Sequence, residues 1–294
     1  MSDRRRITID TADGEPVTAY FREAQAARAF VIIAGATGVK QQFYWNFSDW
    51  LVEHGFSVLT FDFRGVGESL SGDLKNCRAR LQDWGALDMT AVVAWATTHI
   101  QAATHSQANG LPLPLHLIGH SVGGQLVGLM PNHGLLTSVI QVASSSGYFK
   151  GMPLDFRIKT LLLLRSLPLL TKIRGFTPTK IVRYGENLPA GVGLQWADWC
   201  LHPGYVENAF GKTIKEHFYD QFKAPILSIS STDDPIATTK NVDDLLRLFT
   251  VCSIKRLRLQ PSDFGMRTIG HIDFFRKRCS NLWSLTTDWL DGTV

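Results

Sequence analysis

The chain has 294 residues, of which 45% are hydrophobic and 19% are charged, so it can bury a substantial core and is not a disordered protein. Its net charge of +4 is spread along the sequence apart from two short basic clusters, which argues against the concentrated basic face of a nucleic-acid-binding protein. The four cysteines form no Cys-x-x-Cys pair, so we expect neither a zinc ribbon nor a redox pair, and they suit a reducing compartment.

The sequence predicts a cytoplasmic protein. No apolar segment follows the charged residues near the N-terminus, so we expect no secretory signal. The longest apolar run, from Leu161 to Leu170, is interrupted by Arg165 and Pro168 and is too short to span a bilayer.

The N-terminal half predicts strands that alternate with helices. Residues 6–10 and 17–21 alternate between apolar and polar side chains on either side of Asp13-Gly14, which indicates an antiparallel hairpin. The continuous apolar run 29–34 is typical of a strand buried on both faces of a parallel sheet. We then expect a helix over 42–53, a strand over 57–61, a helix over 83–100 and a strand over 115–119.

The second half continues this alternation after one interruption. A strand is expected over 137–142, and residues 148–222 then show only apolar helical pieces between proline and glycine breaks. Strands over 224–229 and 253–259 and helices over 242–249 and 274–290 restore the pattern. We therefore predict an α/β fold with a mostly parallel central sheet and helices on both faces, formed by residues 1–147 and 223–294, and an inserted helical lid over 148–222.

One segment of this pattern carries a chemical signature. Residues 119–123 read Gly-His-Ser-Val-Gly and lie between an apolar strand and a helix expected from about Gly124 to Met130. In such a G-x-S-x-G turn the serine, here Ser121, is held on a sharp bend with its hydroxyl exposed, and the glycines allow strand and helix to pass closely. The helix N-terminus would direct N–H groups at the charge that develops during acyl transfer.

A serine hydroxyl needs a base within hydrogen-bond reach, and the base needs a carboxylate to orient it. In this architecture the residues follow the chain order serine, acid, histidine. Asp233 and Asp234 follow the strand after the lid, and His271 lies in a loop after the last strand. Spacing alone leaves open which of the two aspartates is used.

The chain resembles the α/β-hydrolase superfamily in four motifs, at residues 62–69 (Asp-Phe-Arg-Gly-Val-Gly-Glu-Ser), 119–123, 233–236 (Asp-Asp-Pro-Ile) and 270–271 (Gly-His). Its lid segments and the ending at 270–275 are similar to a bacterial group of predicted hydrolases related to serine aminopeptidase-like and monoglyceride lipase-like enzymes. The resemblance implies the α/β-hydrolase fold, with Ser121 as nucleophile and His271 as general base and acid. It favours Asp234 as the acid, because the family acid usually precedes a pair such as Pro-Ile, and Asp233 stays the alternative.

The resemblance also implies an oxyanion hole made by the backbone N–H groups of Val122 and Ala36, with Thr37 as the alternative to Ala36. Many relatives have His-Gly where this chain has Ala34-Gly35. The donor is a backbone group, so the missing histidine does not exclude this assignment. The motif at 62–69 is interpreted as a structural loop that its Asp and Arg side chains brace by hydrogen bonds.

We therefore expect a serine hydrolase, carboxylesterase-like or lipase-like, that cleaves an ester or related acyl bond of a small, partly apolar substrate through an acyl-enzyme. It would need no metal and no organic cofactor. An acyltransferase or peptidase with the same triad, and a non-catalytic relative that binds an acyl ligand, remain alternatives.

Two further patterns have plainer interpretations. His116 and His120 are four residues apart but fall on a strand and its turn, so they do not converge on a metal ion. The run from Leu161 to Leu170 either packs on the core or forms a wall of an acyl pocket, and a weak contact with a membrane surface through this run is a third interpretation.

Overall fold

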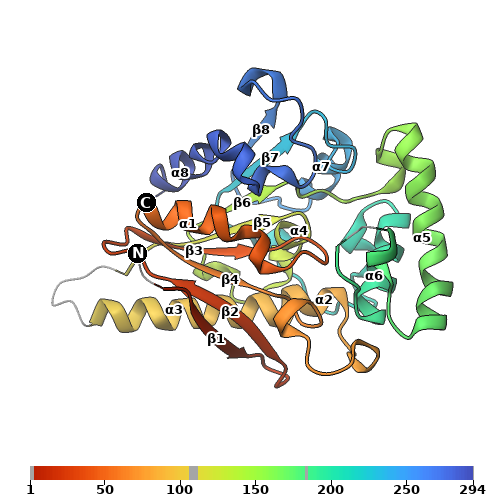
Figure 1. Cartoon of the computed structure of the whole chain (residues 1–294), viewed down its shortest axis with the longest axis horizontal. Coiled ribbons are helices and arrows are strands. Elements are labelled where there is room, and N and C mark those ends of the chain that lie inside the picture. The colour runs from red at the N-terminus through yellow and green to blue at the C-terminus, as the bar shows by residue number, and fades with distance from the viewer. Residues whose placement is uncertain (1–2, 106–111, 183–184, 294) are drawn as a thin grey trace.

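The computed structural model describes residues 3–105, 112–182 and 185–293. Its centre is an eight-stranded sheet with the order β1-β2-β4-β3-β5-β6-β7-β8 (Figure 1). The strands are β1 (Arg5–Asp10), β2 (Pro16–Arg22), β3 (Ala29–Ala34), β4 (Phe56–Phe61), β5 (Leu115–His120), β6 (Ser138–Val142), β7 (Ile226–Ser231) and β8 (Ile254–Leu259).

The sheet is antiparallel only at its N-terminal edge. β1 and β2 form a hairpin in which Arg5 pairs with Phe21, and β2 runs antiparallel to β4. All other neighbouring strands are parallel. Every residue of β3, β4 and β5 is buried, as the continuous apolar runs predict for strands covered on both faces.

Helices cover the two faces of the sheet. The helices are α1 (Trp45–Glu53), α2 (Leu81–Asp83), α3 (Thr90–His105), α4 (Val122–Gln125), α5 (Leu154–Arg174), α6 (Ala190–Leu201), α7 (Thr239–Leu246) and α8 (Ser284–Asp291). α1 and α8 bury Phe47, Leu51 and Leu290 in the core of one face, and α3 buries Val92 and Ala96 in the core of the other (Figure 1). No helix in the described part of the chain is long and apolar enough to cross a membrane.

Two helices stand beyond the carboxyl ends of the parallel strands. α5 and α6 pack against each other at one end of the molecule (Figure 1). α5 is a single helix of 21 residues that continues across Pro168, where the sequence pattern predicts only short helical pieces. It buries Leu164, Leu167 and Thr171, which are three and four residues apart and therefore share one helical face.

Besides α5, two expected helices are divided into shorter segments in the structure. After Ser121, α4 ends at Gln125 and a 3₁₀ segment covers 126–129, instead of one helix over 124–130. Gly128 lies against the ring of Tyr219, where a Cβ atom would be 2.3 Å from the ring. Instead of one helix over 274–290, 3₁₀ segments precede α8, because the adjacent Phe274 and Phe275 are both buried against Phe47. Tertiary packing thus overrides the local helical period.

Candidate active site

Ser121 stands on the sharp turn between β5 and α4. Its backbone has φ 50° and ψ −112°, a conformation that non-glycine residues rarely adopt. The flanking glycines permit this turn, because a Cβ at Gly119 would lie 2.3 Å from the Gly124 nitrogen and one at Gly123 would lie 2.2 Å from the Ala34 oxygen.

Hydrogen bonds hold the strained backbone of Ser121 in place. Its N–H donates to the Val142 carbonyl at 2.8 Å, and its carbonyl accepts from the Gln125 N–H at 3.1 Å and the Ser144 hydroxyl at 2.8 Å. Backbone strain of this kind persists only where several contacts together hold the residue in the strained conformation. The serine hydroxyl is therefore presented in one fixed direction.

Three side chains that are distant in the sequence form one row of hydrogen bonds. The Ser121 hydroxyl lies 3.0 Å from His271 Nε2, and His271 Nδ1 lies 2.8 Å from Asp234 Oδ2. The turn after β5, the loop after β7 and the loop after β8 each supply one residue. The structure thus brings together the three residues that the sequence analysis selects as nucleophile, base and acid.

Asp234 is buried, and its second oxygen is also engaged. Oδ1 accepts the backbone N–H groups of Ile236 at 2.8 Å and Ala237 at 3.0 Å. Burial alone would raise the pKa of Asp234, but attraction to His271 and these hydrogen bonds outweigh it and lower the pKa. The carboxylate is therefore ionised at neutral pH, so His271 Nδ1 donates the hydrogen bond between them.

Asp233 has a different position, although it is the adjacent residue. Its oxygens accept the backbone N–H groups of Ile269 and Gly270, both at 3.0 Å, and the hydroxyl of Ser231. Asp233 therefore holds the loop that carries His271 but does not contact the imidazole. The geometry separates the two aspartates where their spacing in the sequence could not.

The two expected oxyanion donors are arranged differently from each other. Val122 is the first residue of α4, so its N–H has no helical carbonyl one turn earlier to bond with. The Ala36 N–H donates to the hydroxyl of Tyr44 at 2.8 Å and so is directed into the core, which does not fit the role expected from the sequence. Ala36 and Thr37, the alternative, both line the same cavity as Ser121, so it is the hydrogen bond from the Ala36 N–H to Tyr44 that distinguishes them.

A cavity of about 410 Å³ opens over Ser121 and His271. Most of its wall is apolar, and α5 contributes Leu163 and Leu164 to it while α6 contributes Trp196 and Cys200. Its volume lies within the range of about 300–1,000 Å³ that is usual for small-molecule sites. The site thus combines a reactive polar row with room for an apolar group beside it.

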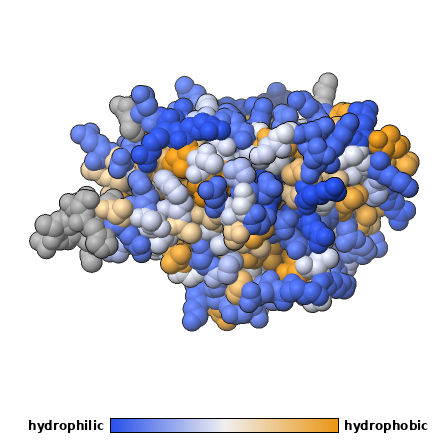
Figure 2. Space-filling view, turned by 90° about the horizontal axis from the view of Figure 1, so that it is seen from below, coloured by the Kyte–Doolittle hydropathy of each residue, from blue (hydrophilic) through white to orange (hydrophobic). Residues whose placement is uncertain are grey.

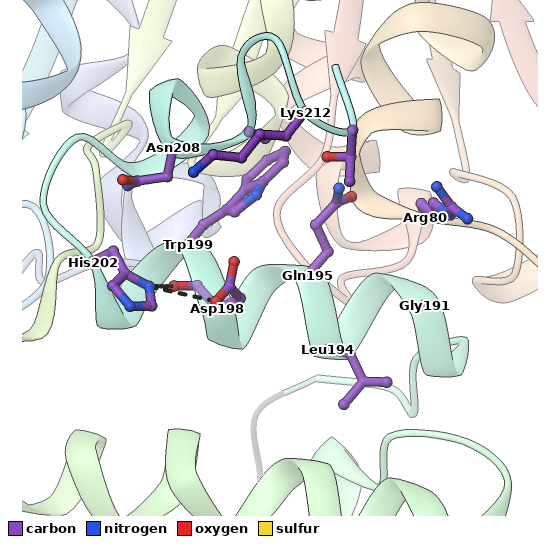
Figure 3. A pocket seen from close by; sticks show the side chains of 11 residues that line it. Arg80, Gly191, Leu194, Gln195, Asp198, Trp199, His202, Asn208 and Lys212 are labelled. Carbon is purple, nitrogen blue, oxygen red and sulfur yellow. Dashed lines mark hydrogen bonds and ion pairs between the residues drawn. The ribbon is translucent and has the colours of Figure 1, made fainter. Parts of the chain in front are cut away.

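A second cavity, of about 530 Å³, lies against α6 and is larger (Figure 3). Its lining is more polar, and in it His202 Nδ1 lies 3.4 Å from Asp198 Oδ1. Ser121, His271 and Asp234 do not line it. Size alone does not identify a catalytic cavity, and we place the candidate site at the smaller one because it contains the hydrogen-bonded row.

The loop over residues 62–69 is a structural element. Asp62 accepts the N–H groups of Gln41 at 2.7 Å and Glu68 at 2.9 Å, and a Cβ at Gly67 would lie 2.3 Å from Asp62 Oδ2. Arg64 Nε donates to the buried Asp88 at 2.6 Å. These hydrogen bonds agree with the bracing role expected from the sequence.

The two histidines of β5 have different hydrogen-bond partners. His116 Nδ1 lies 2.9 Å from the Ser138 hydroxyl, whereas His120 Nδ1 lies 2.8 Å from the hydroxyl of Tyr44. Across the described ranges, no three or more histidine, cysteine or acidic side chains are grouped as metal ligands. Tyr44 carries no signal of such a role in the sequence, because it resembles an ordinary apolar residue of the helix expected over 42–53.

Comparisons with known proteins agree with this architecture. A model of the alpha/beta hydrolase family matches residues 30–262. A soluble variant of monoglyceride lipase from Saccharomyces cerevisiae, solved with a substrate analog, is 15% identical with a TM-score of 0.67, and the match covers 100% of this chain and 96% of that one. An esterase of Pyrococcus furiosus is 15% identical with a TM-score of 0.60, covering 98% and 92%. No curated protein matches the sequence. The α/β-hydrolase fold predicted from the sequence is confirmed.

Proposed function

Because the chain belongs to the α/β-hydrolase family, we propose that it is a serine hydrolase that cleaves an ester of a small, partly apolar substrate through an acyl-enzyme. One observation carries the proposal. Ser121, His271 and Asp234 form a hydrogen-bonded row whose nucleophile and base line a largely apolar cavity. The names of the similar solved structures, an esterase and a monoglyceride lipase, support the same reaction class.

In the first half of the reaction the Ser121 oxygen attacks the carbonyl carbon of the bound ester. His271 Nε2 takes the hydroxyl proton, and Asp234 stabilises the imidazolium that forms. The oxyanion accepts the Val122 N–H and a second N–H, for which Thr37 replaces Ala36, because the Ala36 N–H is bonded to Tyr44. When the carbonyl forms again, the ester C–O bond breaks and His271 protonates the departing alcohol.

In the second half, water attacks the acyl-Ser121 carbonyl and His271 takes its proton. The tetrahedral intermediate then breaks the bond to the Ser121 oxygen, which recovers its proton from His271. The products are the carboxylic acid and the free serine. An acyltransferase or a peptidase would use the same row, with another acceptor in place of water or an amide in place of the ester, and product analysis with added alcohol or amine distinguishes them.

The experiment that tests the proposal is labelling with a fluorophosphonate, which reacts covalently with an activated serine. We expect the wild-type protein to be labelled and Ser121→Ala to lose all labelling while it stays folded. Ser166→Ala is the matched control, because Ser166 is an exposed serine of α5 whose hydroxyl donates to the Leu163 carbonyl at 2.7 Å. Well-folded wild-type protein that is not labelled would support a non-catalytic ligand-binding protein instead.

The substrate preference follows from the cavity. Its apolar wall favours an acyl group without charge, and its volume of about 410 Å³ favours a small substrate. A series of 4-nitrophenyl esters of graded acyl length would measure this preference. We expect kcat/KM to rise with acyl length and then fall where the chain no longer fits between Ser121 and α5.

We also propose that α5 lies on a membrane surface from which such a substrate could enter. Its outer face exposes Leu162, Leu169 and Ile173 by 64–70%, and Figure 2 shows hydrophobic side chains at the end of the molecule that α5 forms. Exposed cationic side chains, among them Arg165 and Lys172, lie on the same helix. Apolar residues beside basic ones suit a surface of anionic lipid.

A further inference from the structure

Two polar side chains, those of Tyr44 and His120, are fully buried beneath the nucleophile, where they are 1% and 0% exposed. The Ala36 N–H lies 2.8 Å from the Tyr44 hydroxyl oxygen, and this oxygen lies 2.8 Å from His120 Nδ1. His120 Nε2 lies 2.8 Å from the backbone carbonyl oxygen of His271. A continuous chain of hydrogen bonds therefore runs from the loop after β3 to the peptide of the candidate base.

The direction of each hydrogen bond is determined. The Ala36 N–H can only donate, so the Tyr44 oxygen accepts it, and the Tyr44 O–H donates to His120 Nδ1 because the neutral imidazole has its one proton on Nε2. The carbonyl of His271 can only accept, so His120 carries its proton on Nε2. Burial lowers the pKa of His120 to about 3, so the imidazole stays neutral and keeps this tautomer throughout the neutral range.

This chain of hydrogen bonds connects three parts of the site that are not neighbours in the sequence. Ala36 precedes Thr37, the proposed oxyanion donor, and His120 precedes Ser121, the nucleophile. The third part is the main chain of His271, whose side chain is held separately by Asp234. The ring of Phe275 packs against both buried side chains, with centroid distances of 5.0 Å to Tyr44 and 4.9 Å to His120.

We propose that Tyr44 and His120 are positioning residues that set the distance between the imidazole of His271 and the oxyanion loop, a role that rests on the proposed hydrolase function. They touch no substrate. They act because the His271 carbonyl and the Ala36 N–H are hydrogen-bonded to the same buried pair. A displacement of about 1 Å in such a site costs on the order of 10²-fold in rate.

The experiment compares Tyr44→Phe and His120→Gln with two matched controls. Tyr205→Phe also removes a fully buried hydroxyl, one that has no hydrogen-bond partner among the described residues. His116→Gln changes the other buried histidine of β5, which contacts Ser138 and not the site. For each variant we would measure kcat and KM for an ester, the fluorophosphonate labelling rate, the thermal midpoint, and the NMR signal of the His271 Nδ1 proton.

We expect Tyr44→Phe and His120→Gln to lower kcat about 10- to 100-fold with KM within about twofold, and to shift or broaden the Nδ1 proton signal. The two controls should keep kcat and that signal even where their thermal midpoints fall. The double variant Tyr44→Phe/His120→Gln should lose no more activity than the worse single variant, because both break one chain.

A normal kcat and an unchanged Nδ1 signal in folded Tyr44→Phe or His120→Gln would overturn the inference, as would equal losses of kcat in the controls. If Tyr44→Phe does not fold, His120→Gln decides alone, because its control shares the same strand and burial. If the wild type is neither labelled nor active, the proposed hydrolase function fails, and the NMR signal still reports whether the pair positions His271.

Discussion

The two adjacent aspartates provide the sharpest test of the site. In Asp234→Asn the side-chain oxygen must stay with the N–H groups of Ile236 and Ala237, because an amide NH₂ cannot accept them. The NH₂ group is then forced to the position that faces His271 Nδ1. Nδ1 becomes the acceptor, the imidazole proton moves to Nε2, and the base can no longer take the proton of Ser121.

The expected loss of kcat is large, although only one carboxylate oxygen is replaced by an NH₂ group. A wrong imidazole tautomer in a triad lowers kcat about 10⁴-fold, which corresponds to about 5.5 kcal/mol of activation free energy. Asp233→Asn keeps the acceptor for the Gly270 N–H or the Ile269 N–H but not both. It weakens the loop at a cost of about 1.5–3 kcal/mol in stability, and kcat should fall no more than about 100-fold.

The assay measures kcat on one 4-nitrophenyl ester, the fluorophosphonate labelling rate and the urea midpoint for both variants and the wild type. Asp234→Asn should be nearly inactive and stay folded, whereas Asp233→Asn should be less stable but active. The reasoning is refuted if Asp233→Asn loses as much activity as Asp234→Asn, or if Asp234→Asn retains more than about a tenth of the wild-type kcat.

Three further predictions concern folding, pH and the outer face of α5. Gly123→Ala places a Cβ 2.2 Å from the Ala34 oxygen and should cost about 3 kcal/mol or more of unfolding free energy, whereas Gly134→Ala, where a Cβ meets nothing within 4 Å, should leave the urea midpoint nearly unchanged. The hydrogen bond from Arg64 lowers the pKa of Asp13 from its ordinary 3.8 to about 2. The ionised Asp13 therefore stabilises the folded state fully above pH 3.8, and this stabilisation is lost as the pH falls towards 2. Asp13→Asn should lower the free energy of unfolding by about 1 kcal/mol at most at pH 6 and should not change it near pH 2. A difference between variant and wild type in urea unfolding that stays constant with pH would contradict this. The wild type should sediment with phosphatidylglycerol vesicles and Leu162→Asp should not. Leu135→Asp is the control and should bind as the wild type does, because Leu135 is 46% exposed but lies outside α5. Equal binding by all three proteins would exclude α5 as the docking face.

The sequence by itself determined where the strands lie along the chain and the α/β class of the fold. The apolar run 29–34 became β3 (Ala29–Ala34), because a strand buried on both faces needs apolar side chains at every position. The G-x-S-x-G turn could also be predicted from the sequence, because its glycines are required by close contacts within a few residues of Ser121 and with the adjacent strand. The chain order serine, acid, histidine then selects His271 and leaves Asp233 and Asp234 as candidates for the acid, of which the family resemblance favours Asp234.

Only the tertiary structure decided the directions of polar atoms. Asp233 and Asp234 have the same chemistry and adjacent positions, and their roles differ because they accept hydrogen bonds from different backbone N–H groups. The resemblance implies Ala36 as an oxyanion donor, but its N–H donates to Tyr44, whose hydroxyl bonds to His120, a residue 76 positions further along the chain. A hydrogen bond depends on where its partner lies to within a few tenths of an ångström, and packing between distant segments sets that position.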